Sequence, residues 1–168
     1  GSAERVADGE AGIDRVAAGQ ARDWRALRAA QRAERHDLGV RQGEEAAEAA
    51  QAARDWLARE RAADPPAKGA HALWLRVTFR YGQHERMRQE RDRARNQAIA
   101  EERVDRAARQ REARFTLLRD QAMAREELRG RQERALAGYE PETAEAIRQR
   151  RTEYELGERR LPDEREQA

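Results

Sequence analysis

Two adjacent prolines, Pro65 and Pro66, divide this 168-residue chain into two segments that each carry the pattern of a long helix. Proline lacks the amide donor that a helix interior needs and disfavours helical backbone at the preceding residue, so a helix that reaches Asp64 must end there. Ala, Arg and Glu, which are strong helix formers, dominate both segments. The sequence therefore predicts an all-α fold in which two long helices are joined by a turn.

Apolar residues at helical spacing give the approximate bounds of each element. Helices are predicted over residues 13–63, 70–80, 83–138 and 141–157, which are the first long helix, a short turn helix, the second long helix and a third, C-terminal helix. Residues 1–12 start with a Gly-Ser pair typical of a cloning scar and carry no apolar period, so we expect a flexible lead-in. Residues 13–158 should form a single helical domain, followed by a charged tail over 159–168.

The two long helices are expected to pack as an antiparallel, coiled-coil-like hairpin, because a short connection favours antiparallel neighbours. If the turn centres near residue 73, facing residues have numbers that add to about 146, so Trp24 meets Leu118 and Ala122. The third helix should then pack beside Ile13, Val16, Leu128 and Leu136. An intermolecular coiled coil is the alternative, so a homodimer stays open.

The second long helix also shows a seven-residue repeat. A strict repeat of seven predicts a left-handed seam that faces a partner helix. Its members are Met87, Ala94, Glu101, Ala108, Phe115, Ala122, Arg129 and Leu136.

Large side chains gather in residues 70–82, which read AHALWLRVTFRYG. Trp74, Phe79 and Tyr81 lie in this stretch, and Trp56 lies near the end of the first long helix. Two interpretations are open: these aromatic residues form a local core, or they form an anchor that a hairpin presents to a partner.

Charged residues make up 40% of the chain, yet the net charge is only +2. Acids and bases are thus mixed, as on solvated helix faces. Two arginine runs stand out as candidate contacts for phosphates or for an acidic partner: Arg22, Arg25, Arg28, Arg32 and Arg35, then Arg86, Arg88, Arg91, Arg93 and Arg95. Acids interleaved with both runs disfavour strong duplex binding, so DNA is an alternative partner and a solvated face is the plain interpretation.

The chain offers little for catalysis. It has no cysteine, and His36, His71 and His84 do not show the spacing of metal ligands. No glycine-rich phosphate loop or nucleophile elbow is present. We therefore expect a protein that is not an enzyme and holds no cofactor or metal. No apolar run is long enough to span a membrane, and the absence of cysteine fits a cytoplasmic location.

Three stretches carry a family resemblance: RALRAAQRAERHDLGVRQ, then ALWLRVTFRYG followed by RMRQERDRARNQA, then REARFTLLRDQAMAREELRGRQERAL. Over about residues 24–137, the chain resembles the helical region C-terminal to the nuclease domain in plasmid mobilisation relaxases of proteobacteria. Relaxases nick plasmid DNA and are delivered by a type IV secretion system after recognition by its coupling ATPase. None of the family's clustered metal-binding histidines is visible in this chain.

The resemblance implies a non-catalytic interaction module of a conjugative relaxase, recognised or translocated by the secretion system. Its partner would be the coupling ATPase or a relaxosome component, in a bacterial cytoplasm or in a recipient cell. Arg159, Arg160 and Arg165 in the tail are similar to the arginine-rich translocation signals of such substrates. The alternatives are an accessory nucleic-acid-binding domain and a structural coiled-coil dimerisation spacer.

Overall fold

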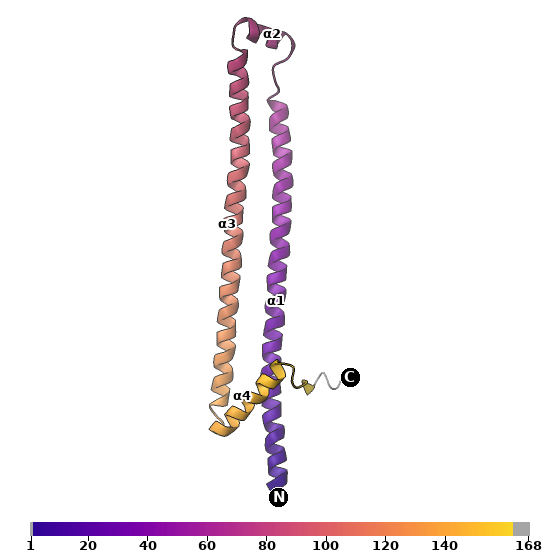
Figure 1. The fold of residues 1–168 in the computed structure, drawn as a ribbon, viewed down its shortest axis with the longest axis vertical. Helices are drawn as coiled ribbons and strands as arrows, with labels where there is room; N and C mark the ends of the chain where they lie inside the picture. Colours follow the sequence, from indigo (N-terminus) through magenta and orange to yellow (C-terminus); the bar gives the residue numbers. More distant parts are fainter. Residues whose placement is uncertain (1, 163–168) are drawn as a thin grey trace. The chain divides into compact units, whose positions relative to one another are not determined.

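The computed structural model describes residues 2–162 and is all-α in that range, as the sequence predicted (Figure 1). Its helices are α1 (Ser2–Ala63), α2 (Gly69–Val77), α3 (Tyr81–Leu136) and α4 (Pro141–Glu155). The predicted pair of long helices, the turn helix and the third, C-terminal helix are therefore confirmed.

Local chemistry explains the helix ends. α1 stops at Ala63, directly before Asp64 and the two prolines. Pro141 occupies the first turn of α4, where its missing amide would have no intrahelical partner. α1 begins at Ser2, so residues 2–12, predicted as a flexible lead-in before the first helix, are part of that helix. Ala, Glu and Arg in this stretch favour the helix more strongly than Gly9 and Gly12 oppose it.

The described chain divides into two compact units. Unit 1 contains the described residues up to His36 and from Thr116 onward, and so holds α4 with parts of α1 and α3. Unit 2 is Asp37–Phe115 and holds α2 with the other parts of α1 and α3. Hydrogen bonds described below show that α1 and α3 run antiparallel within each unit.

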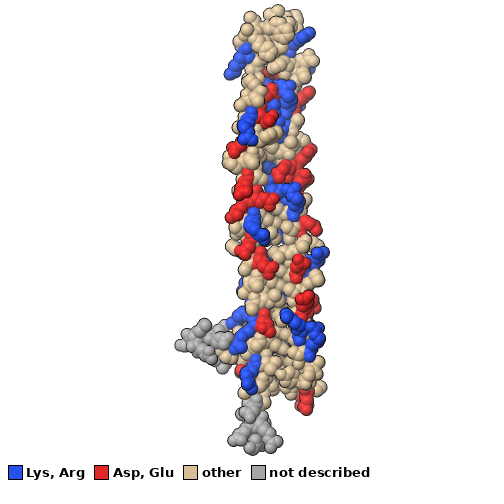
Figure 2. Space-filling view, turned by 180° about the vertical axis from the view of Figure 1, so that it is seen from behind, with Lys and Arg blue, Asp and Glu red and all other residues tan. Residues whose placement is uncertain are grey.

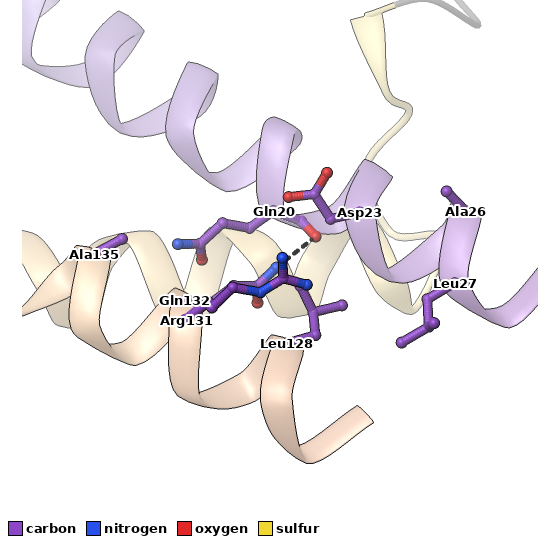
Figure 3. A pocket seen from close by; sticks show the side chains of 8 residues that line it. All are labelled: Gln20, Asp23, Ala26, Leu27, Leu128, Arg131, Gln132 and Ala135. Carbon is purple, nitrogen blue, oxygen red and sulfur yellow. Dashed lines mark hydrogen bonds between the residues drawn. The ribbon is translucent and has the colours of Figure 1, made fainter. Parts of the chain in front are cut away.

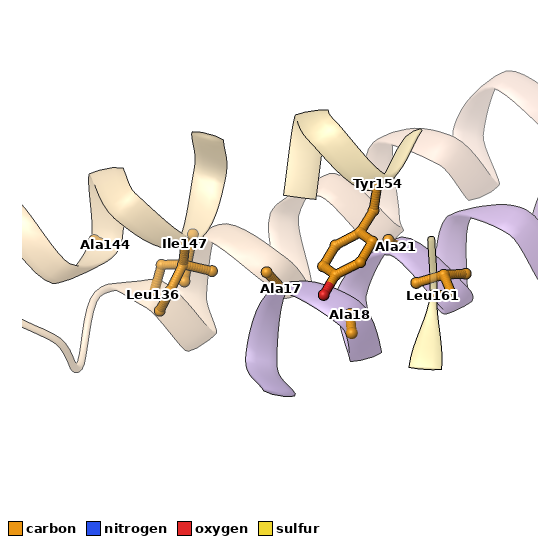
Figure 4. Packing of buried hydrophobic residues seen from close by; sticks show 8 residues of the cluster. All are labelled: Ala17, Ala18, Ala21, Leu136, Ala144, Ile147, Tyr154 and Leu161. Atoms are coloured by element: carbon orange, nitrogen blue, oxygen red, sulfur yellow. The ribbon is translucent and has the colours of Figure 1, made fainter. Parts of the chain in front are cut away.

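Unit 1 has an apolar cluster where α4 packs (Figure 4). Ile147 and Tyr154 of α4 and Leu136 of α3 are its largest fully buried side chains. The rest of the cluster consists of smaller or partly buried side chains: Ile13, Val16, Ala17, Ala18, Ala21, Ala144 and Leu161. The predicted packing of the third helix beside Ile13, Val16 and Leu136 is confirmed, whereas Leu128 is buried outside this cluster.

A polar contact also joins α4 to α1. Tyr154 donates its hydroxyl hydrogen to the carboxylate of Asp14, and Arg150 Nη1 donates to the same oxygen at 3.3 Å. Burial raises the pKa of Asp14, but the hydrogen bonds from Tyr154 and Arg150 outweigh this effect and leave the pKa below its usual value. The carboxylate therefore stays charged between its two donors.

Glutamines occupy the interface between α1 and α3 in both units. In unit 1, Gln31 Nε2 donates to the backbone oxygen of Gln121 at 2.9 Å, and Gln121 Nε2 donates back to Gln31 at 2.9 Å. In unit 2, Gln42 and Gln110 make the same reciprocal pair at 2.9 and 3.1 Å. Each pair gives the interface two hydrogen bonds that depend on the relative position of the two helices.

We call each glutamine pair, with the side chains that bond to it, a glutamine layer. The third of these layers lies in unit 1 and contains Gln20 and Gln132 (Figure 3). Gln132 Nε2 donates to the backbone oxygen of Gln20 at 3.0 Å, the dashed line in the figure. Trp24 Nε1 donates to Gln132 Oε1 at 2.8 Å, and Arg151 of α4 donates to Gln20 Oε1 at 2.9 Å. This layer therefore links α4 to the two long helices.

In the other two layers, arginines donate to side-chain oxygens of the glutamines. Each of these arginines lies one helical turn after a glutamine of its own helix. Arg35 and Arg125 donate to the side-chain oxygens of Gln121 and Gln31 at 2.9 and 3.0 Å. Arg114 donates to Gln42 Oε1 at 3.1 Å. The side-chain oxygens of Gln31, Gln42 and Gln121 thus accept charge-assisted bonds, which are stronger than neutral ones.

The interface glutamines repeat every eleven residues: Gln20, Gln31 and Gln42 on α1, and Gln110, Gln121 and Gln132 on α3. Eleven residues complete almost three helical turns, so each set lies on one face. The seven-residue seam is wrong as the packed face of α3. Of its members only Leu136 is buried, and Met87 and Phe115 are exposed. The glutamine and arginine hydrogen bonds place a different face of α3 against α1.

The predicted register is also wrong. In the observed pairs Gln31 with Gln121 and Gln42 with Gln110, the residue numbers add to 152, six more than predicted. Trp24 bonds to Gln132, whereas Leu118, one of its predicted partners, is exposed. The centre of the turn thus lies near residue 76, half of that sum, and not near residue 73.

Candidate functional site

The turn of unit 2 exposes a group of apolar side chains. Leu73, Trp74 and Val77 lie on one face of α2 and are 64%, 52% and 69% exposed, whereas Leu75 on the other face is buried. Phe79, directly after the helix, is 95% exposed. We call Leu73, Trp74, Val77 and Phe79 the apolar tip. An apolar group this exposed marks an interaction surface more often than a scatter of single residues does.

Phe79 also has unusual backbone geometry, with φ of 55°. Its amide donates to the carbonyl of Arg76 at 3.2 Å, and the amide of Arg80 donates to the carbonyl of Leu75 at 2.8 Å. These two bonds form a Schellman motif, in which the left-handed position usually holds glycine. A phenylalanine there costs about 1 kcal/mol or more and its ring gains almost no burial. Such strain without a packing benefit points to a functional role for the ring.

Basic side chains surround the apolar tip. Lys68, Arg76 and Arg80 lie in residues 65–84, which contain no Asp or Glu. The guanidinium of Arg80 lies over the Trp74 ring, 5.9 Å from its centroid, and that of Arg76 lies over Tyr81 at 4.9 Å. We call Lys68, Arg76 and Arg80 the basic rim. In Figure 2 this end is mostly uncharged, with Lys and Arg at its sides.

The core interpretation of the aromatic cluster is wrong for Trp74 and Phe79, which are exposed. Trp56 and Tyr81 are partly buried. The rest of the fold covers only one face of the nine-residue helix α2, and Leu75 lies on that covered face. Sequence analysis did not select Leu73, Val77 or the basic rim, although the absence of acids in residues 65–84 was a readable signal.

Two histidines support the turn. His71 of α2 and His84 of α3 pack edge to face with ring centroids 5.5 Å apart. No group of three or more His, Asp or Glu side chains in the described range is arranged to hold a metal ion. This pair thus belongs to the contact between α2 and α3.

Part of the first arginine run lines a cavity of about 340 Å³ in unit 1. Arg25, Arg28 and Arg32 line it together with Glu155 of α4, which lies 4.0 Å from the Arg28 guanidinium. Arg28 also lies over the Trp24 ring, at 5.6 Å. The structure thus brings three of the five predicted residues together. Arg35 instead bonds to Gln121, and Arg22 is partly buried.

The second arginine run is mostly neutralised in unit 2. Asp64 accepts hydrogen bonds from Arg91 Nη2 and Arg95 Nη2, both at 2.8 Å, and these two bonds hold its pKa far below the usual range. Arg88 pairs with Glu85 at 3.0 Å. Arg86 and Arg93 are exposed. Arg91 and Arg95 of this run therefore hold the residue that follows α1 against α3.

An additional ion pair closes the same end of the hairpin. Arg61 Nε donates to Asp92 at 3.0 Å, and this hydrogen bond lowers the pKa of Asp92. Arg95 also lies 3.8 Å from Glu60. Asp92, an acid interleaved with the second run, thus has a structural role.

The predicted tail signal is only partly described. Arg159 pairs with Glu153 at 3.0 Å, and Arg160 is exposed. Arg165 lies outside the described residues.

An open groove of about 490 Å³ lies beside Gln20 and Gln132 in unit 1 (Figure 3). Leu27 and Leu128 form its apolar part, and Asp23 and Arg131 add charge. Its lining contains no histidine, serine or threonine.

No protein-family model, curated protein or solved structure matches this chain. None of the helices in residues 2–162 is both long enough and apolar enough to cross a membrane. The apolar tip is therefore the strongest candidate for a functional surface in the described part of the chain.

Proposed function

We propose that this chain is a non-catalytic helical interaction module that docks onto a protein partner through the apolar tip of unit 2. The observation that carries this proposal is Phe79, an almost fully exposed ring held at a left-handed position. With Trp74 beside it, the tip has the composition of an interface anchor, since aromatic residues and arginine dominate binding hot spots.

The resemblance to mobilisation relaxases suggests a setting for this module. In that setting, the module belongs to a conjugative relaxase, and the partner is the coupling ATPase of a type IV secretion system or a relaxosome component. The arginine-rich tail is then part of a translocation signal. Support for this setting comes from the quoted sequence stretches alone.

The test compares the wild-type chain with Phe79→Gly and with a control, Val104→Ser. Val104 is also exposed and apolar, but lies on α3 away from the turn. Pull-down with a purified coupling ATPase and a translocation reporter fused to the chain are the two readouts. We expect binding and transfer by the wild type and the control, and loss of both with Phe79→Gly.

The glycine variant is a sharp test because glycine favours the left-handed backbone that Phe79 adopts. Its melting temperature should equal or exceed that of the wild type, so a loss of binding cannot be ascribed to unfolding. If the wild type neither binds nor transfers, the secretion setting is wrong. If Phe79→Gly binds as well as the wild type, the tip is not the docking surface.

Nucleic-acid binding is the second candidate, favoured by the three arginines that line the unit 1 cavity. Duplex and single-stranded DNA would be titrated at two salt concentrations. If this candidate is right, replacing Arg25, Arg28 and Arg32 with alanine weakens binding and flattens its salt dependence. Equal binding by wild type and triple variant argues against it.

A dimerisation spacer is the third candidate. Val104 and Phe115, at heptad-compatible positions of α3 in unit 2, are exposed and free to meet a second copy. Sedimentation equilibrium reports the oligomeric state directly, and a monomer at all concentrations excludes this candidate.

A further inference from the structure

We infer that the protein surface that receives the apolar tip is acidic: an apolar pocket for Trp74 and Phe79 with carboxylates at its edge. This inference rests on the proposed function and specifies the chemistry of the partner.

The first support is the local charge. Over the whole chain acids and bases almost balance, with 33 Asp and Glu against 35 Lys and Arg. Residues 65–84 break that balance, because they contain the three bases of the basic rim and no acid. A surface that unites exposed apolar groups with charge of one sign is complementary to a partner of the opposite sign.

The second support is that the basic rim is not used inside the fold. None of Lys68, Arg76 and Arg80 has an ion-pair partner among the described residues. In the same unit, by contrast, Arg61, Arg91 and Arg95 all pair with acids. Near the turn, Arg91 and Arg95 thus pair with Asp64 and hold the end of α1 to α3, whereas Arg76 and Arg80 beside the tip have no acidic partner among the described residues.

The third support is the position of the two rim guanidiniums. Arg80 lies over the ring of exposed Trp74, and Arg76 lies over Tyr81. A guanidinium held over an aromatic face loses less side-chain freedom on binding, and its planar donors suit a carboxylate. Arg80 and Trp74 therefore present a cation and an apolar anchor side by side.

A membrane surface with anionic lipids is a different occupant and fits less well. α2 has only nine residues, and three bases near an anionic bilayer contribute about 1 kcal/mol each. Trp and Arg side by side are instead the residues most enriched at protein hot spots.

The experiment selects peptides from a random library displayed on phage, using the immobilised full chain. A parallel selection uses the chain with Trp74→Ser and Phe79→Gly, and peptides found in both are discarded. We expect the remaining, tip-dependent peptides to combine apolar residues with an excess of Asp and Glu. Their affinities are then measured by fluorescence anisotropy with labelled synthetic peptides.

Charge reversal tests the basic rim itself. Arg76→Glu with Arg80→Glu should weaken these peptides roughly tenfold or more, and added salt should weaken their binding to the wild type. The control is Arg103→Glu with Arg111→Glu, which makes the same change in net charge at exposed positions of α3 in unit 2. The control should change affinity far less.

The possible failures are distinguishable. Tip-dependent peptides without excess acid, or peptides unaffected by the Arg76 and Arg80 reversal, overturn the acidic partner and leave the docking function standing. A complete lack of tip-dependent peptides overturns the acidic partner, and the pull-down then decides the docking function separately. Tip-dependent binding to phosphatidylserine vesicles without any such peptide assigns the tip to a membrane surface and overturns the inference.

Discussion

Gln31 and Gln121 each donate a side-chain hydrogen bond to the backbone carbonyl of the other, both at 2.9 Å, and both side chains are buried. A carbonyl oxygen inside a helix already accepts one bond and has a second lone pair free. The pair uses that lone pair on both helices. A slip of α1 against α3 in unit 1 breaks both bonds at once, so this pair helps to set the register.

Gln121→Ala should destabilise the protein by about 1–3 kcal/mol, because it removes the hydrogen bond from Gln121 Nε2 to the backbone oxygen of Gln31, removes the side-chain oxygen to which Arg35 donates, and opens a gap. Urea unfolding followed by circular dichroism measures the change. Gln97→Ala is the matched control, since Gln97 is exposed and bonds only to nearby Glu101. Equal losses for the two variants would contradict a special role for the buried pair.

Gly39 and Gly43 lie inside α1, are exposed, and have open space where a Cβ would project. Alanine there should stabilise the protein by about 1 kcal/mol per site, because glycine loses more backbone entropy in a helix. Thermal unfolding of each single variant and of the pair tests this. A lower melting temperature in either variant would mean that these glycines serve a contact absent from the described chain.

Ile147→Ala should cost about 2–5 kcal/mol, because Ile147 is fully buried in the unit 1 cluster and its removal leaves a cavity. Leu156→Ala, next to the end of the same helix but exposed, is the control and should change little. Chemical unfolding gives the free energies, and hydrogen exchange shows whether α4 opens first. Unchanged exchange in α4 with Ile147→Ala would refute its anchoring role.

Asp64→Asn should lower the stability of the protein at neutral pH and make that stability change less as the pH falls. Hydrogen bonds from Arg91 and Arg95 lower the pKa of Asp64 in the folded protein. A depressed folded pKa gives stability that is complete above the unfolded value, near 4, and is lost as pH falls further. Melting temperatures from about pH 7 to pH 2 should therefore fall less in the variant. Asp105→Asn, at an exposed site of α3, is the control, and identical pH profiles for wild type and Asp64→Asn would reject the effect.

The sequence by itself determined the features that depend on a few neighbouring residues. Pro65 and Pro66 end α1, Pro141 starts α4, and helix-forming residues fill the long segments between them. The packing of α4 beside Ile13 and Val16 was also predictable, because large apolar residues are scarce and each must find cover.

Only the tertiary structure decided which faces meet. Phe115 and Met87 suggested a seven-residue seam, yet they are exposed, while Gln110 and Gln121 face α1. In one sequence a glutamine resembles a surface residue, because its value inside depends on a carbonyl that another helix must bring within 3 Å or so. Trp74 and Phe79 are the opposite case, because they resemble core residues in the sequence and are exposed in the structure. An aromatic side chain fits a core or an anchor equally well, and only the surface left uncovered by the rest of the fold shows which one it is.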